Sequence, residues 1–223
     1  MIVHFDIDSL VYSSCYNVET FEDATHKFDE VYQSIINKIE EDHNVLQVYN
    51  YGFARGNFRK ILDKNYKANR TKPPPEYYYK LVHWVKEYYN VIKGHGVETD
   101  DMVCKGWYKT GQATGQASLI ISIDKDYMQL PALIYNYGRK VYYDLNEEEA
   151  RRNFWTQIIE GDAGDNVNYT KGYGVKWTEK HFEGCLTNFS YIKVVYGLFK
   201  KIYRNKARER FIQCYNLLKL RYE

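Results

Sequence analysis

The chain has 223 residues, a formal net charge of +2 and four cysteines. This length suits one moderately large domain, or a core with a small appendix. No apolar run approaches the ~20 residues of a membrane-spanning helix, so no membrane partner is expected. The cysteines show no CxxC pairing and no signal peptide precedes them, so we expect reduced thiols in a cytoplasmic protein. No P-loop motif is present, so nothing indicates ATP binding.

The hydrophobic pattern predicts an α/β fold. In chain order, the expected elements are a strand at 2–5, a helix at about 28–41, a strand at 45–49, a helix at about 76–91 after the proline break at 73–75, a helix that Thr99 caps, a strand at 118–123, and edge strands at 134–135 and 141–143. The strand at 118–123 is almost continuously apolar, which is typical of a parallel strand covered on both faces. We therefore expect a mainly parallel central sheet flanked by helices, followed by a mostly helical C-terminal element.

Charge is unevenly distributed along the chain. The segment from Arg55 to Lys72 holds seven basic residues opposed only by Asp63, and the segment 200–221 is again basic. The acidic clusters are Asp6 with Asp8, Glu98 with Asp100 and Asp101, Asp124 with Asp126, and Asp162 with Asp165. Most of them follow a predicted strand or begin a predicted helix, where α/β folds place their chemistry. Acidic clusters beside basic surface favour a polyanionic substrate handled by metal ions, although a helix cap or a solvated face explains any one acid alone.

Four motifs, taken in order, carry a resemblance to a known family. They are Tyr66–Arg70, Glu98–Asp101, Asp124–Asp126 and Gly161–Asn166, and the turn Gly172-Tyr173-Gly174 follows them. In these residues the chain resembles the 5′-nucleases, which comprise flap endonucleases, the 5′-nuclease domains of bacterial DNA polymerase I and bacteriophage 5′–3′ exonucleases. The resemblance covers residues 1 to about 185, and the short length is most similar to the bacteriophage-type enzymes.

This resemblance implies both a fold and a function. The fold would be PIN-like, with a nuclease core at 1–160 that includes a helical arch or clamp at about 55–95, and a helix–three-turn–helix DNA-binding element within 161–223. The function would be metal-dependent hydrolysis of DNA at or near 5′ ends, by a 5′–3′ exonuclease or flap endonuclease of DNA replication or repair. Duplex, nicked or flap DNA is the expected partner, with RNA–DNA hybrids as a further substrate, in the host-cell cytoplasm if the source is viral. The alternatives are a PIN-like ribonuclease and a non-catalytic DNA-binding protein whose metal site is partly lost.

The resemblance also implies two divalent cations, Mg²⁺ or Mn²⁺. The carboxylates nearest the scissile phosphate would be Asp6, Glu98, Asp100 and Asp124, and those of the second ion or its waters would be Asp101, Asp126, Asp162 and Asp165. One position departs from the family pattern, because Gly52 stands where the family usually has a further aspartate, six residues before Phe58-Arg59. Asp8 could compensate, or the alternation of a continuing strand could turn it away.

Basic residues complete the implied site. Lys67 and Arg70 are expected to share a helix face at the foot of the arch and to draw the scissile phosphate onto the metals. The residues expected to contact nucleic acid are Arg55, Arg59, Tyr66, Lys72, Lys171, Gly172, Gly174 and Lys176. Tyr66 either stacks on a terminal base or packs in the interior, and packing is favoured. The Gly172–Gly174 turn would hold duplex DNA, with K⁺ bridging there, or would be a plain turn between helices.

Overall fold

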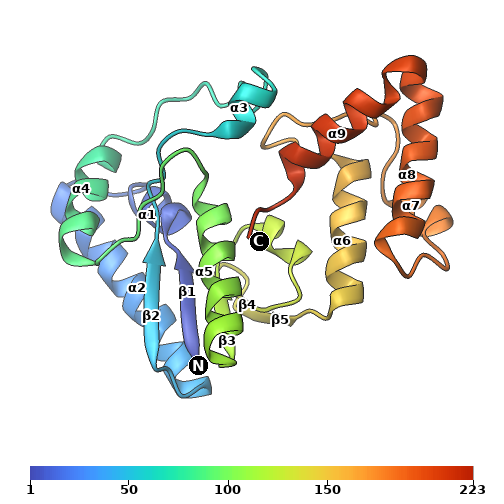
Figure 1. Ribbon diagram of the computed structural model, residues 1–223. Coiled ribbons are helices and arrows are strands. Elements are labelled where there is room, and N and C mark those ends of the chain that lie inside the picture. The colour runs from blue at the N-terminus through green and yellow to red at the C-terminus, as the bar shows by residue number, and fades with distance from the viewer. Residues whose placement is uncertain (223) are drawn as a thin grey trace.

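The computed structural model describes residues 1–222 and contains a five-stranded sheet in the order β2-β1-β3-β4-β5 (Figure 1). The strands are β1 (Ile2–Asp6), β2 (Gln47–Tyr51), β3 (Ser118–Ile121), β4 (Leu133–Asn136) and β5 (Val141–Asp144). β1 pairs in parallel with β2 and β3, β3 pairs in parallel with β4, and β5 joins β4 in the antiparallel sense. The predicted mainly parallel sheet is confirmed. β4 is not an edge strand, however, because β5 pairs along its outer side.

Helices surround this sheet and continue beyond it. They are α1 (Asp8–Ser14), α2 (Phe21–Asp42), α3 (Phe58–Leu62), α4 (Tyr78–Tyr88), α5 (Thr99–Thr114), α6 (Glu147–Glu160), α7 (Val175–His181), α8 (Asn188–Tyr203) and α9 (Ala207–Leu218), with 3-10 turns η1 (Lys125–Gln129) and η2 (Arg204–Lys206). α2 begins earlier than predicted because Thr20 and Asp23 form a capping box. The predicted cap of α5 is wrong by one residue: Glu98 is the N-cap and Thr99 is the first helical residue. Within residues 1–222, no helix has the length and apolar character needed to cross a bilayer.

The two faces of the sheet contribute to two different cores. Val3 and Phe5 point toward α1 and α2, whereas Ile120 and Ile134 pack on the side of α5. This division follows from the alternation of side chains along a strand. β3 is buried on both faces, as its apolar sequence predicts.

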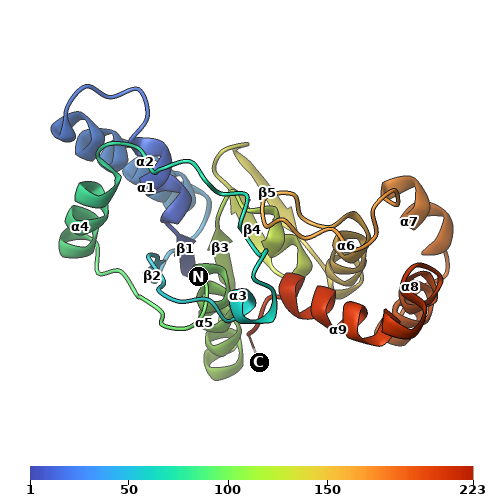
Figure 2. The same cartoon turned by 90° about the horizontal axis from the view of Figure 1, so that it is seen from above.

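A third core lies between the C-terminal helices. Trp155, Phe182, Phe199 and Leu217 belong to it, so α6 packs with α7, α8 and α9. Seen from above, these helices stand on one side of the molecule, opposite α1, α2 and α4 (Figure 2). After α9 the chain returns to the sheet, where Leu220 packs in the α5-side core. The C-terminal helical element is therefore attached at both of its ends.

The segment predicted as a helical arch is helical only in part. It holds the short helix α3 and the helix α4, which runs for 11 residues. The chain between them crosses the top of the molecule without regular helix (Figure 1). Pro73–Pro75 lie in this stretch, and consecutive prolines lack the N–H groups that a helix needs.

Candidate metal centre

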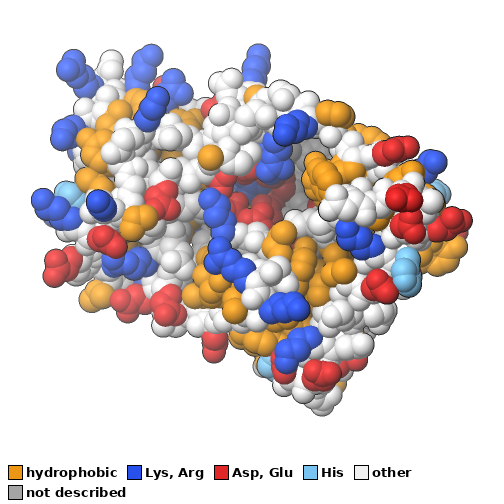
Figure 3. All heavy atoms as spheres, turned by 180° about the vertical axis from the view of Figure 1, so that it is seen from behind, with side chains coloured by type: hydrophobic (Ala, Val, Ile, Leu, Met, Phe, Trp, Pro, Cys, Tyr) orange, Lys and Arg blue, Asp and Glu red, His pale blue; other side chains and the backbone are white. Residues whose placement is uncertain are grey.

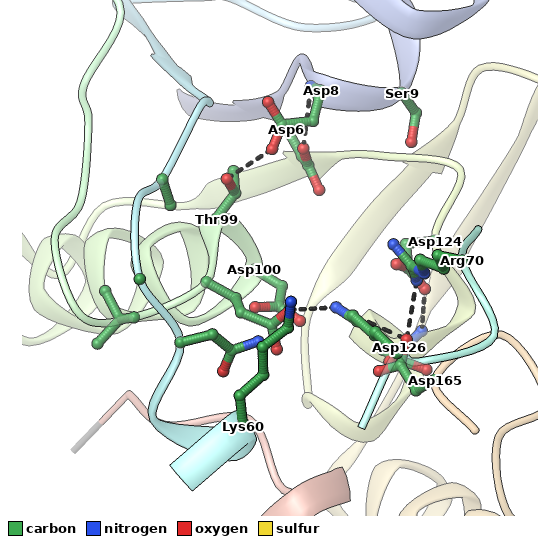
Figure 4. Close-up of a pocket in the computed structure, with 16 residues that line it drawn as sticks. Asp6, Asp8, Ser9, Lys60, Arg70, Thr99, Asp100, Asp124, Asp126 and Asp165 are labelled. Atoms are coloured by element: carbon green, nitrogen blue, oxygen red, sulfur yellow. Dashed lines mark hydrogen bonds and ion pairs between the residues drawn. The ribbon is translucent and has the colours of Figure 1, made fainter. Parts of the chain in front are cut away.

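The acidic clusters meet in one cavity of about 530 Å³. A space-filling view shows a hollow with acidic side chains on its floor and basic side chains near its rim (Figure 3). The carboxylates that line it belong to Asp6, Asp8, Glu98, Asp100, Asp124, Asp126 and Asp165. Figure 4 shows several of them on opposite walls, facing one another across the cavity. Of the predicted metal residues, Asp101 and Asp162 do not line it.

The parallel sheet explains why these acids converge. β1 and β3 are neighbouring parallel strands, so their carboxyl ends lie at the same edge. Asp6 is the last residue of β1, and Asp124 follows β3 by three residues. The Asp124 side chain also caps η1, accepting from the Asp126 N–H at 2.9 Å. The N-terminus of α5 brings Glu98 and Asp100 to the same place, where the helix dipole favours negative charge.

Burial and mutual repulsion raise the pKa values of most of these acids. Burial, then the charge of Asp8, raises the pKa of Asp6 to about 7. Burial, then the charge of Asp124, raises the pKa of Asp126 to about 7. Burial and the charge of Asp101 raise the pKa of Asp100 well above its usual range. A bound cation would reverse these shifts by neutralising the cluster.

The donor set fits hard divalent cations. All candidate ligands are carboxylate oxygens, which Mg²⁺ and Mn²⁺ prefer. In the described chain, 1–222, no three His, Cys, Asp or Glu side chains are grouped closely enough to hold a metal ion among themselves. This open arrangement is compatible with Mg²⁺, which usually takes one or two carboxylates and keeps several waters.

Asp6 gives a prediction about stability without metal. Its folded pKa of about 7 exceeds the ordinary value of 3.8, so the folded state holds a proton that the unfolded state releases. The free energy of unfolding should therefore fall as pH rises from about 4 to 7, and the cost should be complete above 7. With chelator at pH 8, Asp6→Asn should raise stability on the order of 2 kcal/mol, or roughly 4–8 °C.

Thermal denaturation at pH 5 and pH 8 measures this effect. The gain should be smaller at pH 5, and added Mg²⁺ should stabilise the wild type more than the variant. Asp144→Asn, an exposed position at the end of β5, serves as the matched control. An Asp6→Asn protein that is less stable than wild type at pH 8 in chelator would contradict the argument.

Lys67 and Arg70 lie beside the acids, but not on a helix. Lys67 has φ +56° within a run of turns, so the expected shared helix face is wrong. Its ammonium contacts Glu98 and lies 3.6 Å from Asp165 Oδ1. The Arg70 guanidinium is 2.8 Å from the same Asp165 oxygen. Burial alone would lower the pKa of Lys67, but the charges of Glu98 and Asp165 raise it, so Lys67 carries its positive charge.

The two predicted metal residues that do not line the cavity each pair with a cation of the protein itself. Arg59 donates to both oxygens of Asp101, at 2.6 and 2.9 Å, and Asp101 is 2% exposed. Asp162 lies 2.9 Å from the ammonium of Lys125 and accepts from the Asp165 N–H. The expectation that Asp101 faces a metal ion is therefore corrected: it orients Arg59 from behind the cavity wall.

Arg59 and Tyr66 are also corrected as nucleic-acid contacts. Arg59 is 1% exposed, and its guanidinium also donates to Glu98 and to the carbonyls of Leu217 and Lys219. Tyr66 is 2% exposed, and its hydroxyl lies 2.7 Å from Glu98 Oε2 and 2.5 Å from Asp165 Oδ2, so its one proton is shared between the two carboxylates. Neither side chain reaches the surface, so neither can contact a phosphate or stack on a base in this arrangement. For Tyr66, the favoured alternative of interior packing is the right one.

The structure adds residues that the sequence reasoning missed. Tyr127 donates to Asp6 at 2.8 Å, and Gln157 donates to Asp126 at 2.6 Å. Both contacts join distant segments, so no local pattern could have indicated them. The sequence did hold an indication for two lysines near the site. Lys125 stands between Asp124 and Asp126, and Lys60 lies in the basic segment. Lys60 lines the cavity.

The other expected DNA contacts remain accessible. Arg55, Lys72, Lys171 and Lys176 are exposed. In the glycine turn, Gly172 has φ +91°, which favours glycine, and the Tyr173 N–H donates to the carbonyl of Thr170. Gly174 has extended backbone that any residue adopts and precedes α7. DNA and K⁺ binding at this turn stay predictions.

Comparison with known proteins decides the family. A sequence model of the 5′-3′ exonuclease N-terminal, resolvase-like domain matches residues 4–155. The chain belongs to the 5′–3′ exonuclease family. A 5′-3′ exonuclease of Buchnera aphidicola subsp. Schizaphis graminum is 26% identical over 220 residues, which cover 91% of this chain and 74% of the relative. A DNA polymerase I of Rhizobium leguminosarum is 36% identical over 139 residues, 56% of this chain but only 14% of the polymerase.

Solved structures show the same fold. A T5 5′-exonuclease with bound zinc has a TM-score of 0.72 at 18% identity, covering 99% of this chain and 89% of that one. A variant of the bacteriophage T5 D15 flap endonuclease, solved with DNA and metal ions, has a TM-score of 0.66 at 14% identity, covering 98% and 99%. The family membership makes this 5′–3′ exonuclease-family chain a nuclease, and the acidic cavity is its candidate active site.

Proposed function

We propose that this nuclease hydrolyses DNA phosphodiesters at or near 5′ ends, using two divalent cations, Mg²⁺ or Mn²⁺. The observation that carries the proposal is the single cavity in which seven carboxylates (Asp6, Asp8, Glu98, Asp100, Asp124, Asp126 and Asp165) face Lys67 and Arg70. Such a cavity repels a phosphodiester unless cations are present, and it attracts one when they are. The solved relatives that contain metal ions and DNA support the same conclusion.

The carboxylates of the cavity would be shared between two cations. Asp6, Asp100, Asp124 and Glu98 would hold one cation, some of them through its waters, and Asp126 and Asp165 would hold the other or its waters. When bound, the two cations supply an activated water and stabilise both the attacking and the leaving oxygen of the displacement. The protein keeps the acids in place through Tyr127 on Asp6 and Gln157 on Asp126.

Lys67 and Arg70 would orient the scissile phosphate. In the absence of substrate their charges are balanced by Glu98 and Asp165. When the phosphate arrives, these cations can donate charge-assisted hydrogen bonds to its oxygens and offset the charge that develops during the displacement. Arg55 and Lys72 are placed to hold the DNA backbone farther from the reacting bond, since phosphate contacts position a substrate without reading its sequence.

Lys67→Ala should separate chemistry from binding. We expect the single-turnover rate to fall about 10²-fold or more, because the lost interaction is strongest in the transition state, and the DNA dissociation constant to change only a few-fold. Rapid-quench cleavage of a labelled 5′-flap substrate and binding measured in Ca²⁺ give the two numbers. Lys64→Ala removes an exposed lysine of the same segment and is the control. A loss confined to affinity would contradict the assignment of Lys67.

A substrate panel tests the function itself. The protein is incubated with Mg²⁺ or Mn²⁺ and with 5′-flap, nicked and blunt duplexes, an RNA–DNA hybrid and single-stranded RNA, and product lengths are read. Cleavage near DNA 5′ ends that chelator abolishes is the expected result, and cleavage of the hybrid would extend the substrate range to RNA primers. Cleavage restricted to single-stranded RNA would indicate a PIN-like ribonuclease. Binding without cleavage in either metal would indicate a non-catalytic DNA-binding protein.

The glycine turn and the cellular role complete the proposal. Lys171 and Lys176 flank Gly172 at the start of the C-terminal helices, so this turn would hold the duplex behind the cleaved bond, and K⁺ would bind at the turn. Removing flaps or primers would place the enzyme in DNA replication or repair, in the cytoplasm of a host cell if its source is viral. Duplex binding measured in K⁺ and in tetramethylammonium tests the ion, because K⁺ binding at the turn predicts weaker duplex affinity in the larger cation.

A further inference from the structure

We propose that Asp8 is a ligand of the metal centre, and that Gly52 is glycine because Asp8 occupies the space next to it. In this view positions 8 and 52 are alternative sources of one carboxylate, and this chain uses position 8. The inference rests on the proposed metal-dependent function and adds a residue to its site.

Asp8 faces the cavity because β1 has already ended. The strand stops at Asp6, and Asp8 is the first residue of α1, so the alternation of a continuing strand does not apply. Its carboxylate lines the same cavity as that of Asp6. The Asp8 N–H donates to Asp6 Oδ1 at 3.3 Å, which draws the two residues together, and Figure 4 shows both on one wall above Thr99.

Two hydrogen bonds orient the Asp8 carboxylate. Its Oδ1 accepts from the Phe53 N–H at 2.8 Å, and its Oδ2 accepts from the Thr99 hydroxyl at 2.6 Å. Thr99 lies between the cavity acids Glu98 and Asp100, so this bond links Asp8 to the other acidic wall. Neutral donors fix a carboxylate without neutralising it, and a carboxylate can accept about four bonds. Thr99 is therefore a positioning residue for Asp8.

Asp8 differs from several other acids of the site in its lack of an ion pair with the described residues. Glu98, Asp101, Asp162 and Asp165 each form an ion pair with a lysine or arginine within 4.0 Å. Asp8 forms none with the Lys, Arg or His residues of the described chain. Asp8 is partly buried beside Asp6, and its hydrogen-bond partners are neutral, so its carboxylate is oriented and available to a cation.

Gly52 shows why this carboxylate comes from position 8. A Cβ added to Gly52 would stand 3.0 Å from Asp8 Oδ1 and 3.1 Å from the side chain of Ile7. The backbone of Gly52 is not left-handed, so its conformation does not require glycine. The constraint is the occupied space. A side chain at residue 52 would press on the Asp8 carboxylate and on Ile7, which would have to shift by a few tenths of an ångström, so a carboxylate at each position would crowd the other.

Metal binding without DNA tests the inference independently of activity. Mn²⁺ affinity is measured by calorimetry and electron paramagnetic resonance for the wild type, Asp8→Asn, Asp8→Ala, Gly52→Asp and the double variant Asp8→Ala/Gly52→Asp. Asp8→Asn, which keeps the volume and an acceptor oxygen, should weaken Mn²⁺ binding about tenfold or more. Gly52→Asp alone should lower the melting temperature in chelator, because it adds both a close contact and a like charge. The double variant should bind Mn²⁺ within about threefold of the wild type, a non-additive recovery.

The outcomes separate this inference from the proposed function. Mn²⁺ affinity unchanged in both Asp8→Asn and Asp8→Ala would overturn the role of Asp8, even if Asp124→Asn abolishes binding. A folded double variant that binds no better than Asp8→Ala would overturn the exchange between positions 8 and 52. If the double variant does not fold, Asp8→Asn alone decides, with Asp144→Asn as the matched control. A wild-type protein that binds no Mn²⁺ would instead overturn the proposed metal-dependent function.

Discussion

Asp124→Asn is expected to lower DNA cleavage roughly 10³-fold or more and to leave DNA affinity within a few-fold of the wild type. Asp124 lies where the carboxyl end of β3 opens into the cavity, and it forms no ion pair with the Lys, Arg or His residues of the described chain. Its carboxylate is therefore available to a cation, and a lost metal interaction of several kcal/mol gives a rate loss of this size.

The asparagine also spares the local fold. Asp124 Oδ1 caps η1 by accepting from the Asp126 N–H, and an amide oxygen can accept the same bond. The substitution thus removes charge with little change of volume. Single-turnover cleavage in Mg²⁺ and DNA binding in Ca²⁺ measure the two effects, and Asp144→Asn repeats the chemical change at an exposed site. Parallel losses of cleavage and binding would show that Asp124 holds DNA or structure rather than metal.

The parts that the sequence predicted correctly follow from local chemistry. The apolar run of β3 indicated a strand covered on both faces, and a parallel sheet brings the acids that follow its strands to one edge. This argument brings Asp6 and Asp124 together, whereas the grouping of Glu98 with them was implied by the family resemblance. Lys67 and Arg70 could be placed near the acids by family resemblance, but not by helical spacing, because the chain there is a run of turns anchored on Asp165.

The parts that the sequence missed depend on contacts between distant segments. Arg59 lies in a strongly basic, polar stretch that is typical of a surface, yet it is buried; for Tyr66 packing was favoured, but its polar partners were not predicted. They turn inward because Asp101 and Asp165 accept their hydrogen bonds from elsewhere in the chain. Buried polar groups require such partners, and one side of each pair alone does not reveal the other. The same limit applies to Gly52, because the reason for a glycine at this position depends on where the Asp8 carboxylate lies.

Arg59→Met is expected to destabilise the folded protein by about 3–5 kcal/mol, which corresponds to roughly 6–20 °C in melting temperature. The substitution leaves the carboxylate of Asp101, which is 2% exposed, without its cation. It also removes the donors to the carbonyls of Leu217 and Lys219, which tie the end of α9 to the wall of the acidic cavity. Burial alone would lower the pKa of Arg59, but Asp101 and its acidic neighbours raise it, so the guanidinium is charged in the folded state.

A double variant distinguishes a structural role from a DNA contact. Breaking one side of a buried ion pair costs more than removing both sides, so Arg59→Met/Asp101→Asn should recover at least half of the lost stability. The asparagine can still accept the Arg221 N–H that now donates to Asp101 Oδ1. Arg55→Met, at an exposed arginine of the same segment, should change the melting temperature by less than about 2 °C. An Arg59→Met protein of wild-type stability that has lost DNA affinity would identify Arg59 as a DNA contact. It would also mean that other contacts, among them the packing of Leu220 and the hydrogen bonds of Gln129, hold the end of α9.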